Sequence, residues 1–236
     1  MSAYVFAAPM IPSVPVESSE ARFPVHRIYC VGRNFAEHAR EMGAPVERGT
    51  PVFFMKPADA VLPGGGEQPY PSATADLHHE VELVVAVGRD ARGTIPREQA
   101  GDYLFGHALG LDLTRRDLQS AAKAKGLPWD IAKGFDRSAP ISAIVPASQG
   151  MPASDALLWL EVNGTRRQAA ALSDMIFSVA DILHELSLRF ELRAGDLIFM
   201  GTPAGVGALL PGDRWTAGID GFTTLSGCIT ATPHPV

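Results

Sequence analysis

Cysteines and charged residues are scarce in this sequence. Of its 236 residues only two are cysteines, and 19% are Asp, Glu, Lys or Arg. Cys30 and Cys228 lie far apart, each among apolar neighbours, so the sequence predicts buried reduced thiols rather than a disulfide framework. Reduced thiols are typical of a reducing compartment, and we therefore expect the protein to be cytoplasmic.

Runs of basic residues and long hydrophobic runs are missing as well. The formal net charge is -6 and the pI is about 5.6, so the chain would repel a polyphosphate, and nucleic acid is not an expected partner. The mostly apolar stretch Val81–Val87 is far shorter than the roughly 20 residues of a membrane helix. Residues 1–16 are apolar, but Pro9, Pro12 and Pro15 interrupt them and no basic segment precedes them, which predicts an extended arm rather than a signal peptide. We therefore expect a soluble protein without a membrane partner.

Turn-forming residues and hydrophobic residues are plentiful. The sequence has 23 glycines and 19 prolines, and 46% of its residues are hydrophobic, which is enough for a sizeable core. Between the turn formers lie short segments in which Val, Ile, Leu and Phe recur at strand-like spacing. The sequence thus predicts a mainly β fold with short helices, of the α+β class. The expected strands are Arg27–Val31, Val52–Lys56, Glu80–Val87, Leu104–Leu113, Leu157–Val162, Leu197–Met200 and Thr223–Thr230.

Helices are expected in three places. Asn34 is the expected N-cap of the first helix, with Glu37 three positions on as in a capping box. We expect residues 1–68 to form a small N-terminal layer that carries this helix, and residues 69–236 to form the main β-roll domain, with one continuous domain as the alternative. The expected helices run from Asn34 to before Gly43, from Arg115 to Lys125 before Gly126, and after Ser173 and Ser178 through Leu186.

Two glutamates open an otherwise apolar strand. Because side chains alternate along a strand, Glu80 and Glu82 point to one face while Val81 and Leu83 point to the other. Two like charges held side by side raise the free energy unless a cation or a proton relieves them. A solvated strand face is the alternative interpretation of this short pattern.

Asp112 adds a third carboxylate to the pair. It lies in the segment Ala108–Leu113, which is apolar enough to be buried, and a buried carboxylate without a partner is costly to desolvate. Three carboxylates with no nearby cluster of His or Cys favour Mg²⁺, with Mn²⁺ or Ca²⁺ as alternatives, over zinc or copper. Neighbouring residues on a strand face opposite ways, so at most one of His78 and His79 points into the site, and His79 is an outside candidate for a ligand.

Four further residues stand in contexts that suit chemistry. His38 and Glu41 lie three apart on the first expected helix and share a face, which predicts a water-activating dyad, with a surface ion pair as the alternative. Lys133 follows apolar residues and precedes a glycine, so it is either a functional lysine near a strand end or an ordinary exposed one. Thr202, between Gly201 and a proline, lies on a tight turn where backbone and hydroxyl donors often contact a ligand.

Together these segments resemble the fumarylacetoacetate hydrolase family. The likeness runs from about Ile28 to about Gly221, and it rests on the order and spacing of the segments, since each of them is short. Arg115 stands where a small residue is more usual in the family, and Phe35 stands where Tyr is usual. The matching stretches are Cys30-Val-Gly-Arg-Asn34, Phe53-Phe-Met-Lys-Pro57, His78-His-Glu-Val-Glu82, Gly110-Leu-Asp-Leu-Thr114, Gly126-Leu-Pro-Trp129, Lys133-Gly-Phe135 and Gly201-Thr-Pro203.

The resemblance implies a fold and a set of site residues. The fold would be the C-terminal-type fold of the family, a mixed β-sandwich roll. The resemblance also implies a lid-like segment that carries the dyad and orders when substrate binds. It implies the metal ligands Glu80, Glu82 and Asp112, the catalytic residues His38, Glu41 and Lys133, and the substrate-binding residues Arg33, Arg116, Gln119 and Thr202.

The resemblance further implies a metal-dependent hydrolase that cleaves a carbon–carbon bond in an acylpyruvate. The N-terminal arm most resembles that of bacterial fumarylpyruvate hydrolases, so we expect fumarylpyruvate to be cleaved to fumarate and pyruvate. An oxaloacetate decarboxylase, or a decarboxylase or isomerase of another 2-oxo dicarboxylate, is the alternative within the family. From another class, the alternative is a non-catalytic β-rich module with a structural Ca²⁺. The family resemblance also suggests a homodimer.

Overall fold

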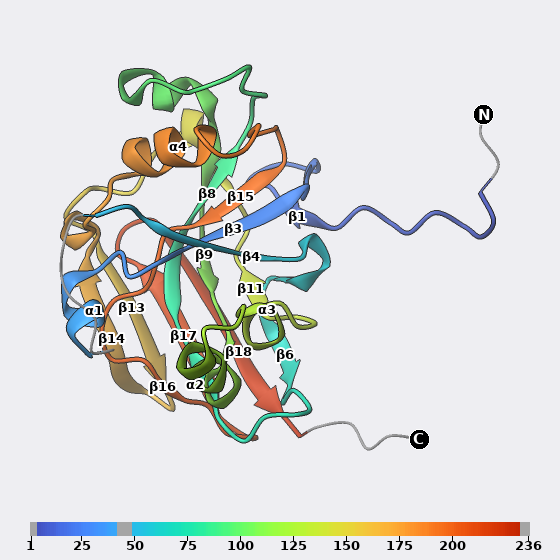
Figure 1. Ribbon diagram of the computed structural model, residues 1–236, viewed down its shortest axis with the longest axis vertical. Helices are drawn as coiled ribbons and strands as arrows, with labels where there is room; N and C mark the ends of the chain where they lie inside the picture. Colours follow the sequence, from blue (N-terminus) through green and yellow to red (C-terminus); the bar gives the residue numbers. More distant parts are fainter. Residues whose placement is uncertain (1–3, 42–48, 232–236) are drawn as a thin grey trace.

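Two curved sheets form the body of the protein, which the computed structural model describes for residues 4–41 and 49–231 (Figure 1). The strand order is β4-β3-β15-β8-β9-β11-β5 in the larger sheet, where β12 also pairs with β9, and β14-β13-β17-β18-β6 in the smaller one. The larger sheet contains β3 (Arg27–Gly32), β4 (Val52–Lys56), β5 (Val61–Pro63), β8 (Val81–Val87), β9 (Leu104–Leu111), β11 (Ala139–Ile141), β12 (Val145–Pro146) and β15 (Asp196–Phe199). The smaller sheet contains β6 (Gly66–Pro69), β13 (Leu157–Val162), β14 (Thr165–Ala171), β17 (Arg214–Ile219) and β18 (Thr223–Thr230).

Short strands and helices surround the two sheets. The helices α2 and α3 contact each other beside the sheets, and α4 lies at the far end of the molecule (Figure 1). The small sheets are made of β1 (Ser13–Pro15) with β2 (Arg22–Pro24), and of β10 (Thr114–Arg115), β7 (Leu77–His79) and β16 (Gly207–Ala208). The α-helices are α1 (Ala36–Glu41), α2 (Arg116–Lys125), α3 (Asp130–Lys133) and α4 (Val179–Ser187), and the 3-10 helices are η1 (Ala58–Ala60), η2 (Arg97–Tyr103), η3 (Ala147–Gln149) and η4 (Leu172–Asp174).

The main hydrophobic core lies between the two sheets. Val81, Leu83 and Val85 of β8 pack in this core together with Leu158 and Leu160 of β13. The apolar residues on the other face of β8 belong to a second core, to which β1 and β2 also contribute. The strand is therefore buried on both faces, and a carboxylate on β8 is removed from bulk water.

Most of the expected elements are present. Each expected strand is found, with the expected bounds for β4, β13 and β18, and the mainly β fold with short helices is confirmed. The expected helices at α2 and α4 are also confirmed; Gly126 ends α2 in the left-handed conformation, and Ser178 caps α4. Three strands of the smaller sheet, β6, β14 and β17, were not expected. In the larger sheet, strands from both sides of residue 68 pair, and β6 of the smaller sheet spans that residue; the division of the chain there stays a prediction.

The predicted role of Asn34 as a helix N-cap is wrong. The helix α1 begins at Ala36, and the fully buried Asn34 side chain bonds elsewhere. Its amide nitrogen donates to the carbonyls of Phe177, at 3.1 Å, and Met200, at 2.7 Å, while its oxygen accepts the N–H of Phe177 at 2.7 Å. Asn34 thus joins the start of α1 to the end of β15 and to the segment before α4. The expected end of this helix before Gly43 lies outside the described residues.

The N-terminal residues project from the body. Residues 4–11 form an exposed arm (Figure 1), which agrees with the expected extended arm for this part of it. Within residues 4–41 and 49–231, every helix is too short or too polar to cross a membrane. Cys30 and Cys228 are both free thiols; Cys30 is buried as predicted, whereas the predicted burial of Cys228 is wrong, because this side chain is partly exposed.

Candidate metal site and active site

Three buried carboxylates meet where β8 begins and β9 ends. Glu80 joins β7 to β8, Glu82 is the second residue of β8, and Asp112 directly follows β9. Their exposed fractions are 5%, 1% and 0%, so the alternative of a solvated strand face does not hold. One oxygen from each carboxylate lies within 4.8 Å of the others, and His79 is not part of this group. A cluster of hard oxygen donors suits a divalent cation such as Mg²⁺, Mn²⁺ or Ca²⁺.

The pairing of β8 with β9 brings the carboxylates together. The register places Glu82 opposite Gly110 and Val81 opposite Leu111, so the residues that flank these pairs are neighbours across the two strands. The N–H of Asp112 accordingly donates to the carbonyl of Glu80 at 2.8 Å. The sequence had predicted that both residues lie within the strands. The structure places them just outside.

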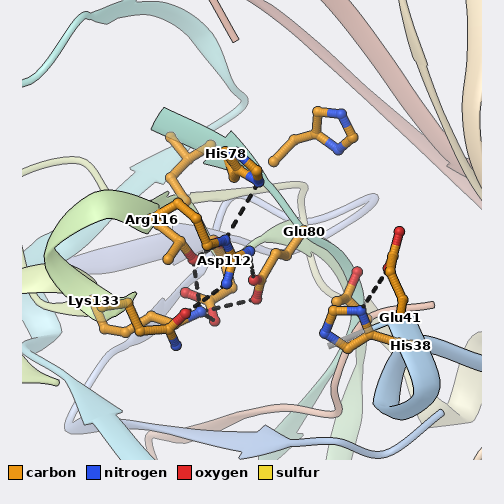
Figure 2. Close-up of polar contacts among 12 residues, drawn as sticks. His38, Glu41, His78, Glu80, Asp112, Arg116 and Lys133 are labelled. Carbon is orange, nitrogen blue, oxygen red and sulfur yellow. Dashed lines mark hydrogen bonds and ion pairs between the residues drawn. The ribbon is translucent and has the colours of Figure 1, made fainter. Parts of the chain in front are cut away.

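Lys133 is the cation at the centre of this group. Its ammonium lies 2.8 Å from Glu80 Oε2, 2.6 Å from Asp112 Oδ2 and 2.7 Å from Thr114 Oγ1 (Figure 2). Its side chain is 2% exposed, which rules out an ordinary exposed lysine. The expectation that Lys133 stands near a strand end is wrong, because it is the last residue of the short helix α3.

Two further cations balance the buried carboxylates. Arg116, in the first turn of α2, donates to Glu80 Oε1 and, at 2.5 Å, to Gln119 Oε1. Lys56, at the end of β4, is also buried, and its ammonium lies 2.8 Å from Asp112 Oδ1. The sequence analysis missed Lys56, although a lysine that ends an otherwise apolar strand was a visible signal.

Glu80 and Glu82 differ in their electrostatic surroundings. Burial favours the neutral form of Glu80, but the charges of Lys133 and Arg116 together outweigh burial and lower its pKa. Burial, followed by the charges of the other two carboxylates, raises the pKa of Glu82 well above its usual value. In the described part of the chain, the hydrogen-bond donor of Glu82 is a backbone group, the N–H of Gly201, at 2.7 Å. Glu82 is therefore the carboxylate whose ionised form a bound divalent cation would stabilise most.

The turn after β15 needs a glycine at position 201. Gly201 has a φ of +94°, and a Cβ atom there would lie 2.7 Å from Asn34 Cβ and 3.0 Å from the carbonyl oxygen of Val31. This conformation aims the Gly201 N–H at Glu82 and places the next residue, Thr202, in the wall of the pocket. The tight turn thus supplies a backbone donor and a hydroxyl to the same site.

His38 and Glu41 form a pair on α1. Their side chains meet at 3.1 Å between Nδ1 and Oε2, and the N–H of Gly205 donates to Glu41 Oε1 at 3.1 Å. The His38 side chain is only 9% exposed, so the alternative of a surface ion pair fits it poorly. Because Nδ1 faces the carboxylate, Nε2 is the ring nitrogen left to act as a base. Figure 2 shows the pair on the opposite side of the site from Arg116 and Lys133.

One pocket brings most of the expected site residues together. Asp112, which pairs with Lys133, and Glu41, which pairs with His38, do not line this pocket. The lining adds residues that sequence reasoning missed, among them Lys123, Phe54 and Trp129. The expected residues in the wall are Arg33, His38, Glu80, Glu82, Arg116, Gln119, Lys133 and Thr202.

Several cationic side chains line the pocket. Arg33, Arg116 and Lys123 all line it, and burial, followed by the charge of Arg116, lowers the pKa of Lys123. Arg33 adopts a φ of 60°, a conformation that is uncommon for residues other than glycine. Such a group of guanidinium and ammonium donors suits an anionic ligand with carboxylate groups.

Several known proteins are similar to this chain in sequence and in fold. The family model described as fumarylacetoacetate (FAA) hydrolase C-terminal matches residues 27–230. A fumarylpyruvate hydrolase from Pseudomonas aeruginosa, whose crystal structure is a complex with Mn²⁺ and pyruvate, is 48% identical, with a TM-score of 0.94 over 97% of this chain and 100% of that one. The mitochondrial oxaloacetate tautomerase FAHD1 of Rattus norvegicus is 47% identical over 84% of this chain and 89% of that protein. The mitochondrial oxaloacetate decarboxylase of Dictyostelium discoideum is 41% identical over 84% and 90%, respectively. The chain therefore belongs to the fumarylacetoacetate hydrolase family of enzymes.

Proposed function

We propose that this protein is a divalent-metal-dependent acylpyruvate hydrolase whose main substrate is fumarylpyruvate, which it splits into fumarate and pyruvate. The observation that carries the proposal is the combination, in one pocket, of the acidic cluster with the imidazole of His38. The similarity to the P. aeruginosa hydrolase over nearly the whole of both chains supports it. A metal site alone would fit a structural ion, but a structural ion needs no base beside it.

The residues that would hold the cation are Glu80, Glu82 and Asp112. Their oxygen-only donor set fits Mg²⁺, which we propose as the native ion, and also Mn²⁺, which the P. aeruginosa relative contains. When bound, such an ion acts as a Lewis acid toward a 2-oxo acid that chelates it. The three carboxylates are buried, and each is held in place by a hydrogen bond or an ion pair, which limits the conformations open to it.

His38 is the proposed general base. Its Nε2 takes a proton from a water molecule that attacks the distal 4-carbonyl carbon of the substrate. Glu41 orients the ring and stabilises the imidazolium that forms, and Gly205 in turn holds Glu41 through its backbone N–H. The bond between C3 and C4 then breaks, which gives the carboxylic acid and the enolate of pyruvate, and the enolate takes up a proton.

The cationic residues of the pocket bind the charged parts of the substrate. Lys133 stabilises the negative charge that develops on the pyruvate enolate, because its ammonium is fixed at the carboxylate cluster. The guanidinium groups of Arg33 and Arg116 are placed to hold substrate carboxylates, with Gln119 beside Arg116. Fumarylpyruvate carries a carboxylate at each end, so a pocket with several cations suits it.

Oxaloacetate is the second candidate substrate, because the R. norvegicus and D. discoideum relatives are named for reactions of this compound. From oxaloacetate the same enolate forms by loss of CO₂, and no attacking water is needed. The two reactions therefore make different demands on His38, whereas both use the acidic cluster and Lys133.

The test is an assay of the purified protein with Mg²⁺ or Mn²⁺ against fumarylpyruvate, acetylpyruvate and oxaloacetate, with pyruvate release as the measurement. We expect the highest kcat/KM for fumarylpyruvate and no turnover after chelation of the metal. Faster release from oxaloacetate would contradict the hydrolase assignment and support the decarboxylase. Conversion of oxaloacetate between its keto and enol forms without pyruvate release would support a tautomerase.

The cytoplasmic location and the homodimer are proposals that rest on sequence and family resemblance. The free thiols of Cys30 and Cys228 are compatible with a reducing compartment. Light scattering on the purified protein tests for the dimer, and fractionation of the source cells tests for the location.

A further inference from the structure

Gln168 is a buried polar residue in an otherwise exposed edge strand. It lies on β14, where its flanking residues Arg167 and Ala169 are exposed, and only 1% of Gln168 is accessible. Its amide lies between β8 on one side and the turn after β15 on the other. A buried side-chain amide needs partners for its two N–H donors and for its oxygen. The identity of these partners therefore shows which of the two terminal atoms is the nitrogen and which is the oxygen.

Two backbone groups fix which way the Gln168 amide points. The N–H of Val81, which can only donate, lies 3.2 Å from Oε1. The carbonyl of Pro203, which can only accept, lies 2.8 Å from Nε2. Because the backbone leaves no ambiguity about either partner, the oxygen faces β8 and the nitrogen faces the turn.

This orientation determines the hydrogen bonds of the two other partners. Oε1 also contacts His79 Nδ1 at 2.8 Å, so the His79 ring carries a proton on that nitrogen. Nε2 donates its second hydrogen to Thr202 Oγ1 at 2.8 Å. The Thr202 oxygen therefore acts as an acceptor toward Gln168, and its own hydrogen is left for another acceptor.

The free hydrogen of Thr202 is available to a ligand in the catalytic pocket. Thr202 lines that pocket, is 3% exposed, and follows the glycine that donates to Glu82. In the described residues no protein acceptor takes the Thr202 hydroxyl hydrogen. A molecule bound in the pocket would therefore supply the acceptor for this hydrogen, and an anionic oxygen is the strongest kind of acceptor.

We propose that Gln168 is a positioning residue for substrate recognition, which fixes the Thr202 hydroxyl as a hydrogen-bond donor toward a carboxylate or enolate oxygen of a bound 2-oxo acid. This inference rests on the proposed function, since it takes the pocket to be the substrate site. Gln168 itself lies behind the pocket wall and does not line it. It acts through Thr202 alone, so its effect depends on the hydroxyl at that position.

A double-mutant cycle tests this dependence. The probe is oxalate, which resembles the pyruvate enolate, and its dissociation constant is measured by calorimetry on the full-length protein loaded with Mn²⁺. We expect Gln168→Met and Thr202→Val each to weaken oxalate binding by about 10- to 100-fold, as for the loss of one hydrogen bond to a charged group. The double variant should bind as Thr202→Val alone does, because the hydroxyl that Gln168 orients is already gone. On a Thr202→Ser background, Gln168→Met should still weaken binding.

Controls separate this role from general damage to the fold. Gln99→Met, at an exposed position on η2, should leave oxalate binding unchanged, and the Mn²⁺ affinity of Gln168→Met should equal that of the wild type. If Gln168→Met does not fold, Gln168→Glu replaces it in the cycle, because a carboxylate can accept from Val81 and His79 but cannot donate to Thr202.

The outcomes distinguish this inference from the proposed function. Equal losses from Gln168→Met in the wild-type and Thr202→Val backgrounds would show an effect that does not pass through the hydroxyl, and would overturn the inference while the function stands. A wild-type protein that binds Mn²⁺ but not oxalate would overturn both.

Discussion

The ammonium of Lys133 lies 2.6 Å from Asp112 Oδ2, and the exposed fractions of the two side chains are 2% and 0%. Each of these charges alone would be costly to bury, so each depends on the other. Burial lowers the pKa of Lys133, but the charges of Asp112 and Glu80 outweigh it and raise the pKa above its usual value. The ammonium therefore stays charged at physiological pH and is part of what holds the acidic cluster together.

Replacement of Lys133 by Met should destabilise the metal-free protein by about 3–5 kcal/mol, because Asp112 and Glu80 lose a buried cation. Urea unfolding in the presence of a chelator measures this loss. Added Mn²⁺ should restore part of the stability, since the ion binds to the folded state and replaces the missing charge. The matched control is Lys125→Met, at an exposed position on α2, which should change stability little. A Lys133→Met protein as stable as this control would contradict the buried charge balance.

Glu82→Gln should abolish measurable binding of Mn²⁺ and metal-dependent turnover. The amide keeps the shape of the side chain but removes the negative charge that a hard cation prefers. Binding is measured by electron paramagnetic resonance of free Mn²⁺, and turnover by pyruvate release. Glu67→Gln, an exposed position on β6, is the control and should behave as the wild type. Metal-dependent activity in Glu82→Gln would remove the proposed metal site.

Binding of Mn²⁺ should release protons. Burial and the neighbouring carboxylates raise the pKa of Glu82, so before the cation binds this carboxyl group holds a proton more readily than an ordinary glutamate does. The cation binds the ionised form, and the affinity should therefore fall as the pH falls. Calorimetric titrations in buffers of different ionisation enthalpy count the protons released. No proton release in the wild type would contradict a raised pKa at this residue.

His38→Ala should suppress hydrolysis of fumarylpyruvate much more than decarboxylation of oxaloacetate. Hydrolysis needs a base for the attacking water, and such a base typically contributes about 100- to 10,000-fold to the rate. Decarboxylation needs no water, so it should lose little. Glu41→Gln should show the same pattern in a milder form, since it alters the orientation of the ring rather than removing it. Equal losses in the two reactions would argue against a water-activating role for His38.

Local patterns were sufficient to predict the central strands and the acidic cluster. The run from Val81 to Val87 is apolar on both faces, and only a strand in the middle of a sheet is buried in this way. The short pattern of the two glutamates also allowed a solvated strand face, and it is the structure that shows them to be buried. The edge strand β14 gave no comparable signal, because its first residues are polar and exposed, and β17 contains a glycine at position 218 that packs against Trp159.

Contacts between distant segments could not be read from the sequence. Asn34 looks like a helix cap, but its partners Phe177 and Met200 lie more than 140 positions away. Gln168 likewise has no local pattern that distinguishes it from an exposed strand residue, and its role depends on a turn 34 positions further on. Side chains of this kind are satisfied by tertiary hydrogen bonds, which compete with the local motifs that the sequence shows.

The buried ring of His107 should make the protein less stable in acid. His107 lies on β9 beside Phe222, and its Nδ1 has no hydrogen-bond partner in the described part of the chain. Burial lowers the pKa of His107 to about 4, from an ordinary value of 6.5. The unfolded chain therefore takes up a proton at this residue below about pH 6.5, while the folded chain resists it until about pH 4.

The sign of the effect follows from this difference in proton uptake. Stability that is present above pH 6.5 is lost as the pH falls, by roughly 2 kcal/mol at pH 5 from His107 alone. His107→Leu removes the titrating group, so its free energy of unfolding should fall less between pH 7 and pH 5 than that of the wild type. Urea unfolding at both pH values measures the difference, and the other titrating groups are common to both proteins. Parallel losses in the two proteins would show that His107 is already protonated, or hydrated, in the folded state.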